Sequence, residues 1–232
     1  MNQERIYSIL KCSFYTNYFK DEFPYNSKYK VFKNVLDKIF MIHLKTNSYE
    51  LIEGLAYREM LSLYNEIENK EQLLPQQIKK NLNDYTVTLS NILNLIKIGS
   101  KIPVFGPTNH FYSHNGNTIR LKNTALYRAI DGEYYSYYFS PYSNSFEVKN
   151  DPVPFILWDL LDVFIKDTLN KNTSLTLKVI YIKANNEVDS EEIFSTEQKA
   201  YDILHSLMEN KNIALPKFDC KEKCKYKNRC KI

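Results

Sequence analysis

The first hundred residues carry apolar side chains at helical spacing. Between positions 28 and 45, apolar residues such as Phe32, Leu36 and Ile39 recur every three or four positions. This spacing gives a helix one continuous apolar face. Comparable patterns lie before and after this segment. The sequence therefore predicts helices over 5–20, 28–45, 48–65 and 76–98.

After residue 100 the pattern changes to short apolar or aromatic runs separated by turn dipeptides. Asn115-Gly116 and Asp131-Gly132 are of the kind that closes two-residue hairpins. They predict two hairpins, with strands at 110–114 and 118–121 and at 125–130 and 133–139. The remaining expected elements are a strand at 102–105, a short strand at 146–149, a helix over 152–169, a strand at 175–183 and a helix over 195–210.

This order of elements predicts an α/β fold with a mixed sheet. We expect an N-terminal helical region over 1–100, an α/β core over 101–215 and a C-terminal cysteine-rich tail over 216–232.

Composition excludes several classes of protein. Hydrophobic residues are 44% of the chain and charged residues 25%, an ordinary balance for a globular protein. No apolar run approaches the roughly 18 residues of a membrane helix, and the N-terminus lacks an apolar leader. We therefore expect a cytoplasmic protein without a membrane partner. The chain has five glycines and no phosphate-binding glycine motif, which gives no support to nucleotide binding.

Basic charge is concentrated at the C-terminal end. Net charge is +4, and the tail carries seven Lys or Arg against two Asp or Glu, so the rest of the chain is close to neutral. Lys225, Lys227 and Arg229 could contact nucleic-acid phosphates. Alternatively, they offset the negative charge of a thiolate-ligated cluster.

The four cysteines are Cys12 and the closely spaced Cys220, Cys224 and Cys230. Disulfides are disfavoured because nothing in the sequence indicates secretion. Four thiolates would satisfy zinc, although structural zinc is usually held by two close ligand pairs. The spacing favours a 4Fe-4S cluster, with three ligands in one segment and one distant. Zinc and unligated cysteines remain the alternatives.

This layout resembles the iron–sulfur branch of the PD-(D/E)xK nuclease superfamily, which includes RecB-like, AddB-like and CRISPR-associated exonucleases. In that branch one cysteine precedes the nuclease core and three follow it, usually as Cys-x2-Cys-x5-Cys. Here the first gap of the trio holds one extra residue. The resemblance spans nearly the whole chain. It implies a restriction-endonuclease-like core over 101–215, with the four cysteines holding the cluster.

The resemblance also implies a metal site made by an Asp on one strand and an Asp/Glu-x-Lys on the next. These residues hold Mg²⁺ or Mn²⁺ and activate water against a phosphodiester. One placement follows the Asp131-Gly132 turn and assigns 123–125 and 138–140, where neither an acid nor a lysine stands. The other uses Asp131 with Glu147 and Lys149. Hairpin geometry favours the first placement and therefore a degenerate site.

The four histidines have weaker claims to a role. His43 falls where the superfamily's assisting histidine could sit, although a core histidine is the commoner explanation. His110 and His114 flank an expected hairpin strand, and His205 falls on the last expected helix, from which it could replace one cluster ligand.

Three functions follow from these patterns. The favoured one is a catalytically degenerate iron–sulfur protein that serves as a DNA-binding or scaffold subunit of a DNA-processing or defence complex. Its partners would be DNA, single-stranded or at ends, and a helicase or another subunit. The alternatives are an active Mg²⁺- or Mn²⁺-dependent single-strand exonuclease that uses Asp131, Glu147 and Lys149, and a zinc-tailed protein-interaction module.

Overall fold

A computed structural model describes residues 27–46, 48–71, 75–97, 100–114, 117–122, 125–169 and 174–193, together with positions 202 and 205. The expected helix over 5–20 with Cys12, and the tail from 216 with its three cysteines, lie outside the described residues. The expected helix over 195–210 is described only at Asp202 and His205, and both positions are helical.

Three helices open the described chain: α3 (Ser27–Thr46), α4 (Tyr49–Glu71) and α5 (Pro75–Ile96). They confirm the helices expected over 28–45, 48–65 and 76–98. The apolar spacing in α3 produces a buried face, because Phe32, Leu36 and Ile39 are all fully buried. α4 extends six residues past its expected end.

The central sheet has five strands in the order β1-β4-β5-β6-β7. Their bounds are β1 Lys101–Phe105, β4 Leu126–Ala129, β5 Tyr134–Phe139, β6 Leu175–Ile182 and β7 Val188–Ile193. Neighbouring strands are antiparallel except β5 and β6, which are parallel. A parallel pair needs a long crossover, and helix α7 (Pro152–Leu169) lies in that crossover. The mixed sheet and the helix expected over 152–169 are confirmed.

Both expected hairpins are confirmed. β2 (Asn109–His114) and β3 (Asn117–Lys122) form a separate antiparallel ribbon between β1 and β4 in the sequence. The second hairpin pairs β4 with β5, and Leu126 faces Ser136. Its turn holds Gly132 at a φ of +93°, a conformation that glycine adopts without a steric penalty.

At the sheet's edge one expectation was wrong, and one strand was not expected. Residues 146–149 were expected as a strand, but Ser145–Lys149 form helix α6. The cause is a reciprocal cap: the Asn144 side chain accepts a hydrogen bond from the Glu147 amide at 2.8 Å and donates one to the Glu147 carboxylate at 2.7 Å. Strand β7 was not expected, because its interior from Asp189 to Glu192 is polar.

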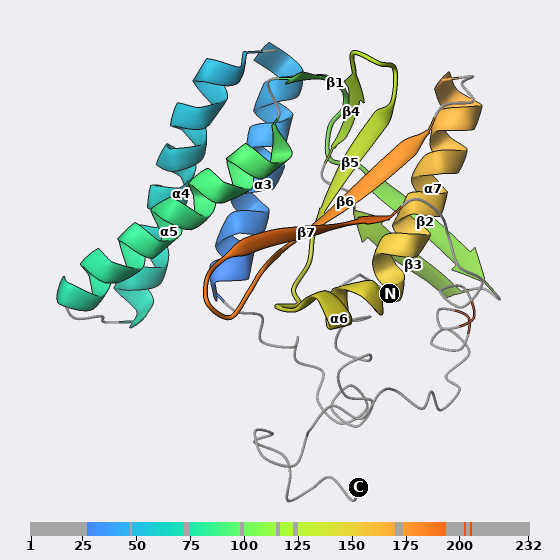
Figure 1. Cartoon of the computed structure of the whole chain (residues 1–232). Coiled ribbons are helices and arrows are strands. Elements are labelled where there is room, and N and C mark those ends of the chain that lie inside the picture. Colours follow the sequence, from blue (N-terminus) through green and yellow to red (C-terminus); the bar gives the residue numbers. More distant parts are fainter. Residues whose placement is uncertain are drawn as a thin grey trace, which may run out of the picture.

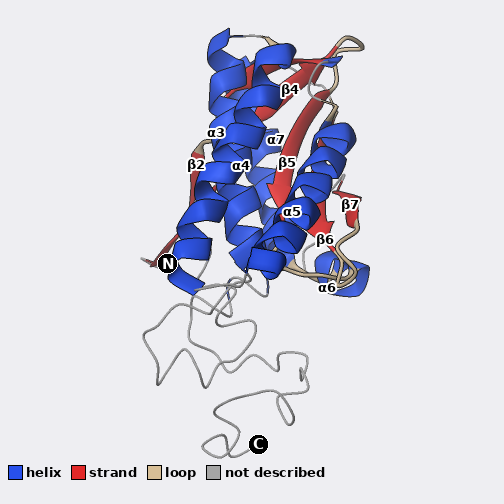
Figure 2. Ribbon diagram, turned by 90° about the vertical axis from the view of Figure 1, so that its left-hand side faces the viewer, coloured by secondary structure: helices blue, strands red, loops and turns tan. Residues whose placement is uncertain are grey.

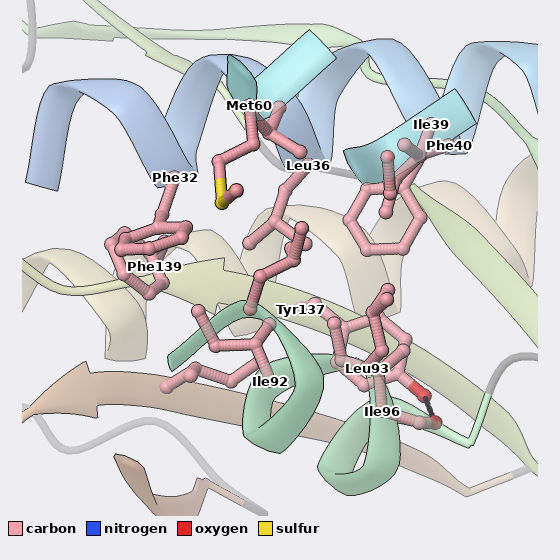
Figure 3. Packing of buried hydrophobic residues seen from close by; sticks show 14 of the residues in the cluster. Phe32, Leu36, Ile39, Phe40, Met60, Ile92, Leu93, Ile96, Tyr137 and Phe139 are labelled. Atoms are coloured by element: carbon pink, nitrogen blue, oxygen red, sulfur yellow. Dashed lines mark hydrogen bonds between the residues drawn. The ribbon is translucent and has the colours of Figure 1, made fainter. Parts of the chain in front are cut away.

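Helices cover both faces of the sheet, which gives three layers. α3, α4 and α5 lie on one face and α7 on the other (Figure 1). Figure 2 turns the three-helix side toward the viewer. Each face has its own buried core. On the three-helix side, Phe40, Tyr137 and Phe139 pack among the helices (Figure 3). On the α7 side, Leu157 and Leu161 pack against Val179.

None of the helices in the described part of the chain is long and apolar enough to cross a membrane.

Candidate functional site

Asp131 and the Glu147–Lys149 pair lie beyond opposite ends of β5. Asp131 sits in the β4–β5 turn, where its Oδ1 accepts a hydrogen bond from the Glu133 amide at 3.0 Å. Glu147 and Lys149 belong to α6, which follows the other end of the strand (Figure 1). A six-residue strand spans about 20 Å, whereas one divalent ion binds carboxylate oxygens at about 2 to 2.6 Å. These residues are not brought together.

Glu147 and Lys149 also have local partners. The Glu147 carboxylate is engaged in the cap with Asn144, and Lys149 Nζ lies 3.4 Å from Glu191 Oε2. The side chains of this Glu-x-Lys therefore cap α6 and pair with β7. As a helix, α6 also lacks the strand geometry that the second placement of the metal site requires.

The other placement uses 123–125 and 138–140, and the structure describes it in part. Leu126 faces Ser136 in antiparallel register, and Ala125 directly precedes Leu126. Ser136 Oγ donates a hydrogen bond to the Ala125 carbonyl at 2.9 Å, which ties the two segments together. Positions 123 and 124 lie outside the described residues. Ala125 and the segment 138–140 are buried and carry neither carboxylate nor amine.

His43 lies in the core against β4. Its side chain is 2% exposed, and its Nδ1 is 3.3 Å from the Tyr127 hydroxyl. Burial lowers the pKa of His43 and raises that of Tyr127, so both groups are neutral at physiological pH. The hydrogen-bonding partner of this histidine is thus a phenol, inside the core.

Aromatic rings fill the sheet face around His43. Tyr127 and Tyr137 meet edge to face at 5.9 Å, and Phe40 packs at 5.7 Å from each of them. The Tyr137 hydroxyl donates to the Ile96 carbonyl at 2.8 Å, the dashed contact in Figure 3. Burial raises the pKa of Tyr137. This part of the sheet is packed core.

The remaining histidines do not assemble a metal site in the part of the chain that is described. His110 and His114 lie on β2, but their side chains are not among the described ones. His205 is an isolated described position. Among the described residues, no three His, Cys, Asp or Glu side chains are grouped so that they could hold a metal ion.

A cavity of about 450 Å³ lies at the C-terminal ends of β5 and β6, and most of the residues that line it are polar. It is lined by Ser143, Asn144, Ser145, Tyr181, Lys183, Ala184, Asn185, Asp189 and Glu191. Its charged side chains have local partners: Lys183 Nζ lies 2.7 Å from Asp189 Oδ2, and the Glu191 carboxylate accepts a hydrogen bond from the Ser145 hydroxyl. The hydrogen bond from Lys183 lowers the pKa of Asp189. No sequence pattern indicated this cavity, because β7 was not expected.

A second cavity, of about 430 Å³, lies between α3 and the base of the β2–β3 ribbon. It is lined by Asp37, Lys38, Met41, Ile42, Pro107 and Lys122. Lys122 Nζ lies 2.6 Å from Asp37 Oδ2 and so ties the ribbon to α3. An exposed apolar side chain lines this cavity, since Met41 is 40% exposed.

Comparison with known proteins yields little. No protein family matches the chain, and no curated protein does. The crystal structure of SSO0001 is similar over 86% of this chain and 84% of that chain, with 10% identity and a TM-score of 0.36. At that TM-score the likeness carries no argument about fold or function.

Proposed function

We propose that this chain is a catalytically degenerate iron–sulfur protein with a restriction-endonuclease-like core, which serves as a DNA-binding or scaffold subunit of a cytoplasmic DNA-processing or defence complex. The observation that carries the proposal is which residues stand at the ends of the β4–β5 hairpin. Where the superfamily keeps two carboxylates and a lysine, this hairpin presents Ala125 and the segment 138–140.

Sheet topology supports the choice of fold. The resemblance implies a strand, a hairpin, a helix and a further strand in that order. The chain has β1, the β4–β5 hairpin, α7 and then β6 parallel to β5. The ribbon β2–β3 is an addition between β1 and β4.

The sequence supports the cofactor. The four cysteines, Cys12, Cys220, Cys224 and Cys230, lie outside the described residues. Four thiolates suit a 4Fe-4S cluster, which would fasten the two ends of the chain. The same four thiolates would also suit zinc, and iron content separates the two metals.

Mg²⁺ or Mn²⁺ does not fit the described residues. Hard divalent ions need several oxygen ligands around one point. Asp131 and Glu147 lie beyond opposite ends of β5, and the region near His43 presents buried phenols. The described residues therefore support no metal-dependent cleavage. Because the tail is basic, we expect Lys225, Lys227 and Arg229 to contact phosphates.

Anaerobic purification tests the proposal. We expect an absorption band typical of an iron–sulfur cluster, about four iron atoms per chain, and binding of labelled single-stranded DNA without cleavage in Mg²⁺ or Mn²⁺. A colourless protein with stoichiometric zinc would instead support a zinc-tailed interaction module. Robust cleavage that Glu147→Ala abolishes would support the active exonuclease.

A further inference from the structure

The β2–β3 ribbon has two different faces. Successive side chains of a strand point to opposite sides, and in the observed register Phe111 faces Arg120 while His110 faces Leu121. Leu121 is fully buried in the core beside α7. The opposite face is the outer face of the ribbon. It carries Asn109, Phe111, Ser113, Thr118, Arg120 and Lys122.

Phe111 and Arg120 form an exposed pair on this outer face. Phe111 is 63% exposed, and Arg120 is also exposed. Directly opposite residues in an antiparallel pair have Cβ atoms about 5 Å apart. Within the described part of the chain, no residue forms an ion pair with the Arg120 guanidinium. An open aromatic ring thus lies beside a cation without a counter-charge.

The ribbon holds this pair in a defined place. Next to it, Ser113 Oγ and Thr118 Oγ1 are hydrogen-bonded at 3.0 Å. At the base of the ribbon, the Lys122–Asp37 ion pair fixes the outer face against α3. The cavity between α3 and the ribbon begins there, with an apolar lining that includes Met41, Ile42 and Pro107.

The charges around this surface favour an anionic partner. Three cations border it: Lys38, Arg120 and Lys122. Lys38 and Lys122 each have one carboxylate partner, Glu59 and Asp37 respectively, whereas Arg120 has no carboxylate partner among the residues that the structure describes. A partner that suits the surface alternates flat apolar groups with negative charges.

Single-stranded nucleic acid has this chemistry. Every base offers a π face to an aromatic side chain, and each nucleotide brings a phosphate. In a duplex the base faces are stacked on one another and cannot reach Phe111. We infer that the outer face of the β2–β3 ribbon, with the adjoining α3 cavity, is a contact site for single-stranded DNA. A base stacks on Phe111, Arg120 binds a phosphate, and the apolar cavity lining receives a neighbouring base. This inference rests on the proposed DNA-binding function.

The test measures binding of a short fluorescein-labelled oligothymidylate to the full chain by anisotropy. Chelator is present to prevent cleavage, and the salt concentration is varied. Phe111→Leu keeps an apolar strand residue but removes the ring, and Phe111→Trp restores one. Arg120→Gln removes the cation. Phe146→Leu and Arg128→Gln are matched controls, because Phe146 is 76% exposed on α6 and Arg128 is exposed on β4.

We expect Phe111→Leu to weaken binding roughly 5-fold to 150-fold, the range for loss of one base–aromatic stack. The salt dependence should stay unchanged, and Phe111→Trp should restore binding. Arg120→Gln should lower the slope of log affinity against log salt by about 0.7, as for one phosphate contact on a single strand. The control variants should bind like the parent protein.

Two outcomes would overturn the inference. If Phe111→Leu and Arg120→Gln bind like their controls, DNA contacts another surface, and the proposed function survives without this site. If the parent chain does not bind the oligonucleotide at all, the proposed DNA-binding function is wrong and the site falls with it. Circular dichroism on each variant checks that the ribbon substitutions leave the fold intact.

Discussion

His43 and Tyr127 meet inside the core, where the His43 Nδ1 atom of α3 lies 3.3 Å from the Tyr127 hydroxyl of β4. Because burial lowers the pKa of His43 below its ordinary value of 6.5, the folded chain takes up this proton only at lower pH than the unfolded chain. Between the two pKa values the unfolded state binds more protons, so the free energy of unfolding rises with pH there.

The first prediction concerns that pH dependence. The stabilising contribution of neutral His43 is complete above pH 6.5 and is lost as the pH falls from 6.5 toward the folded-state pKa. One proton gives a slope of at most about 1.4 kcal/mol per pH unit. Urea unfolding at a series of pH values should show this slope in the parent and not in His43→Gln. Identical pH profiles for the two proteins would contradict the burial argument.

Lys97 provides a test of backbone strain. It follows α5 with a φ of +47°, which is costly for a residue with a Cβ and natural for glycine at a helix C-terminus. We predict that Lys97→Gly raises the free energy of unfolding by about 1 kcal/mol. Lys80→Gly, at an exposed position inside α5, should lower it by up to about 1 kcal/mol. The same sign for both variants in urea unfolding would be inconsistent with strain at Lys97.

Substitutions in the α6 cap can distinguish a structural role for Glu147 from a catalytic one. Asn144→Ala should lower the free energy of unfolding by about 1 kcal/mol, a typical value for loss of an N-cap, and Glu147→Ala should lower it by less. Cleavage of single-stranded DNA in Mg²⁺ or Mn²⁺ should be at background for the parent and both variants. Cutting by the parent that only Glu147→Ala removes would show that Glu147 is catalytic.

The cysteines should couple metal content to stability. Cys12→Ala and Cys230→Ala are each expected to lose iron and to melt at lower temperature, because the free energy of binding the cluster is also free energy of folding. Iron analysis and thermal unfolding under anaerobic conditions measure both effects. Full iron content with unchanged melting in either variant would remove that cysteine from the ligand set.

The basic tail should contribute a sequence-independent electrostatic term to DNA binding. Replacing Lys225, Lys227 and Arg229 by Gln should weaken binding and flatten its salt dependence. Each lost phosphate contact lowers the log–log slope by about 0.9 on duplex and about 0.7 on single strands. An unchanged slope would mean that these residues balance local charge and do not contact phosphates.

The hydrophobic pattern predicts much of the fold, because long periodic segments and Gly-containing turns have few alternative structures. α3, α5 and the turn at Asp131-Gly132 are examples. The strand predicted at 146–149 was wrong because an alternation of apolar and polar residues over only four positions fits both a strand and a single helical turn. The cap between Asn144 and Glu147 decides for the helix. β7 has too few apolar residues to be recognised as a strand from its sequence. Its strand structure is formed by pairing with β6.

The candidate sites were harder to predict than the fold. The hairpin register that separates Asp131 from Glu147 follows from the turn sequence. The groups that surround His43 depend on packing between α3 and β4, which no local pattern encodes. The pair Phe111 and Arg120 could be suspected from the hairpin signal alone, because the two residues lie nine positions apart and symmetrically about the turn. Only the burial of Leu121 shows which face is outward.

The chain has one tryptophan, and it lies on the α7 side of the sheet, so that core can be followed optically by itself. Tyrosines are buried on both sides of the sheet, with Tyr127 and Tyr137 on the three-helix side and Tyr138 and Tyr181 on the α7 side, so tyrosine absorbance reports on both cores. The single tryptophan, Trp158 on α7, belongs to the α7 side, where its indole N–H donates to the Leu175 carbonyl at 2.8 Å. Among the described residues, α3, α4 and α5 contribute most of the helical circular dichroism. A loss of that signal at lower denaturant concentration than the change in tryptophan fluorescence would reveal a helical layer that detaches while α7 remains on the sheet.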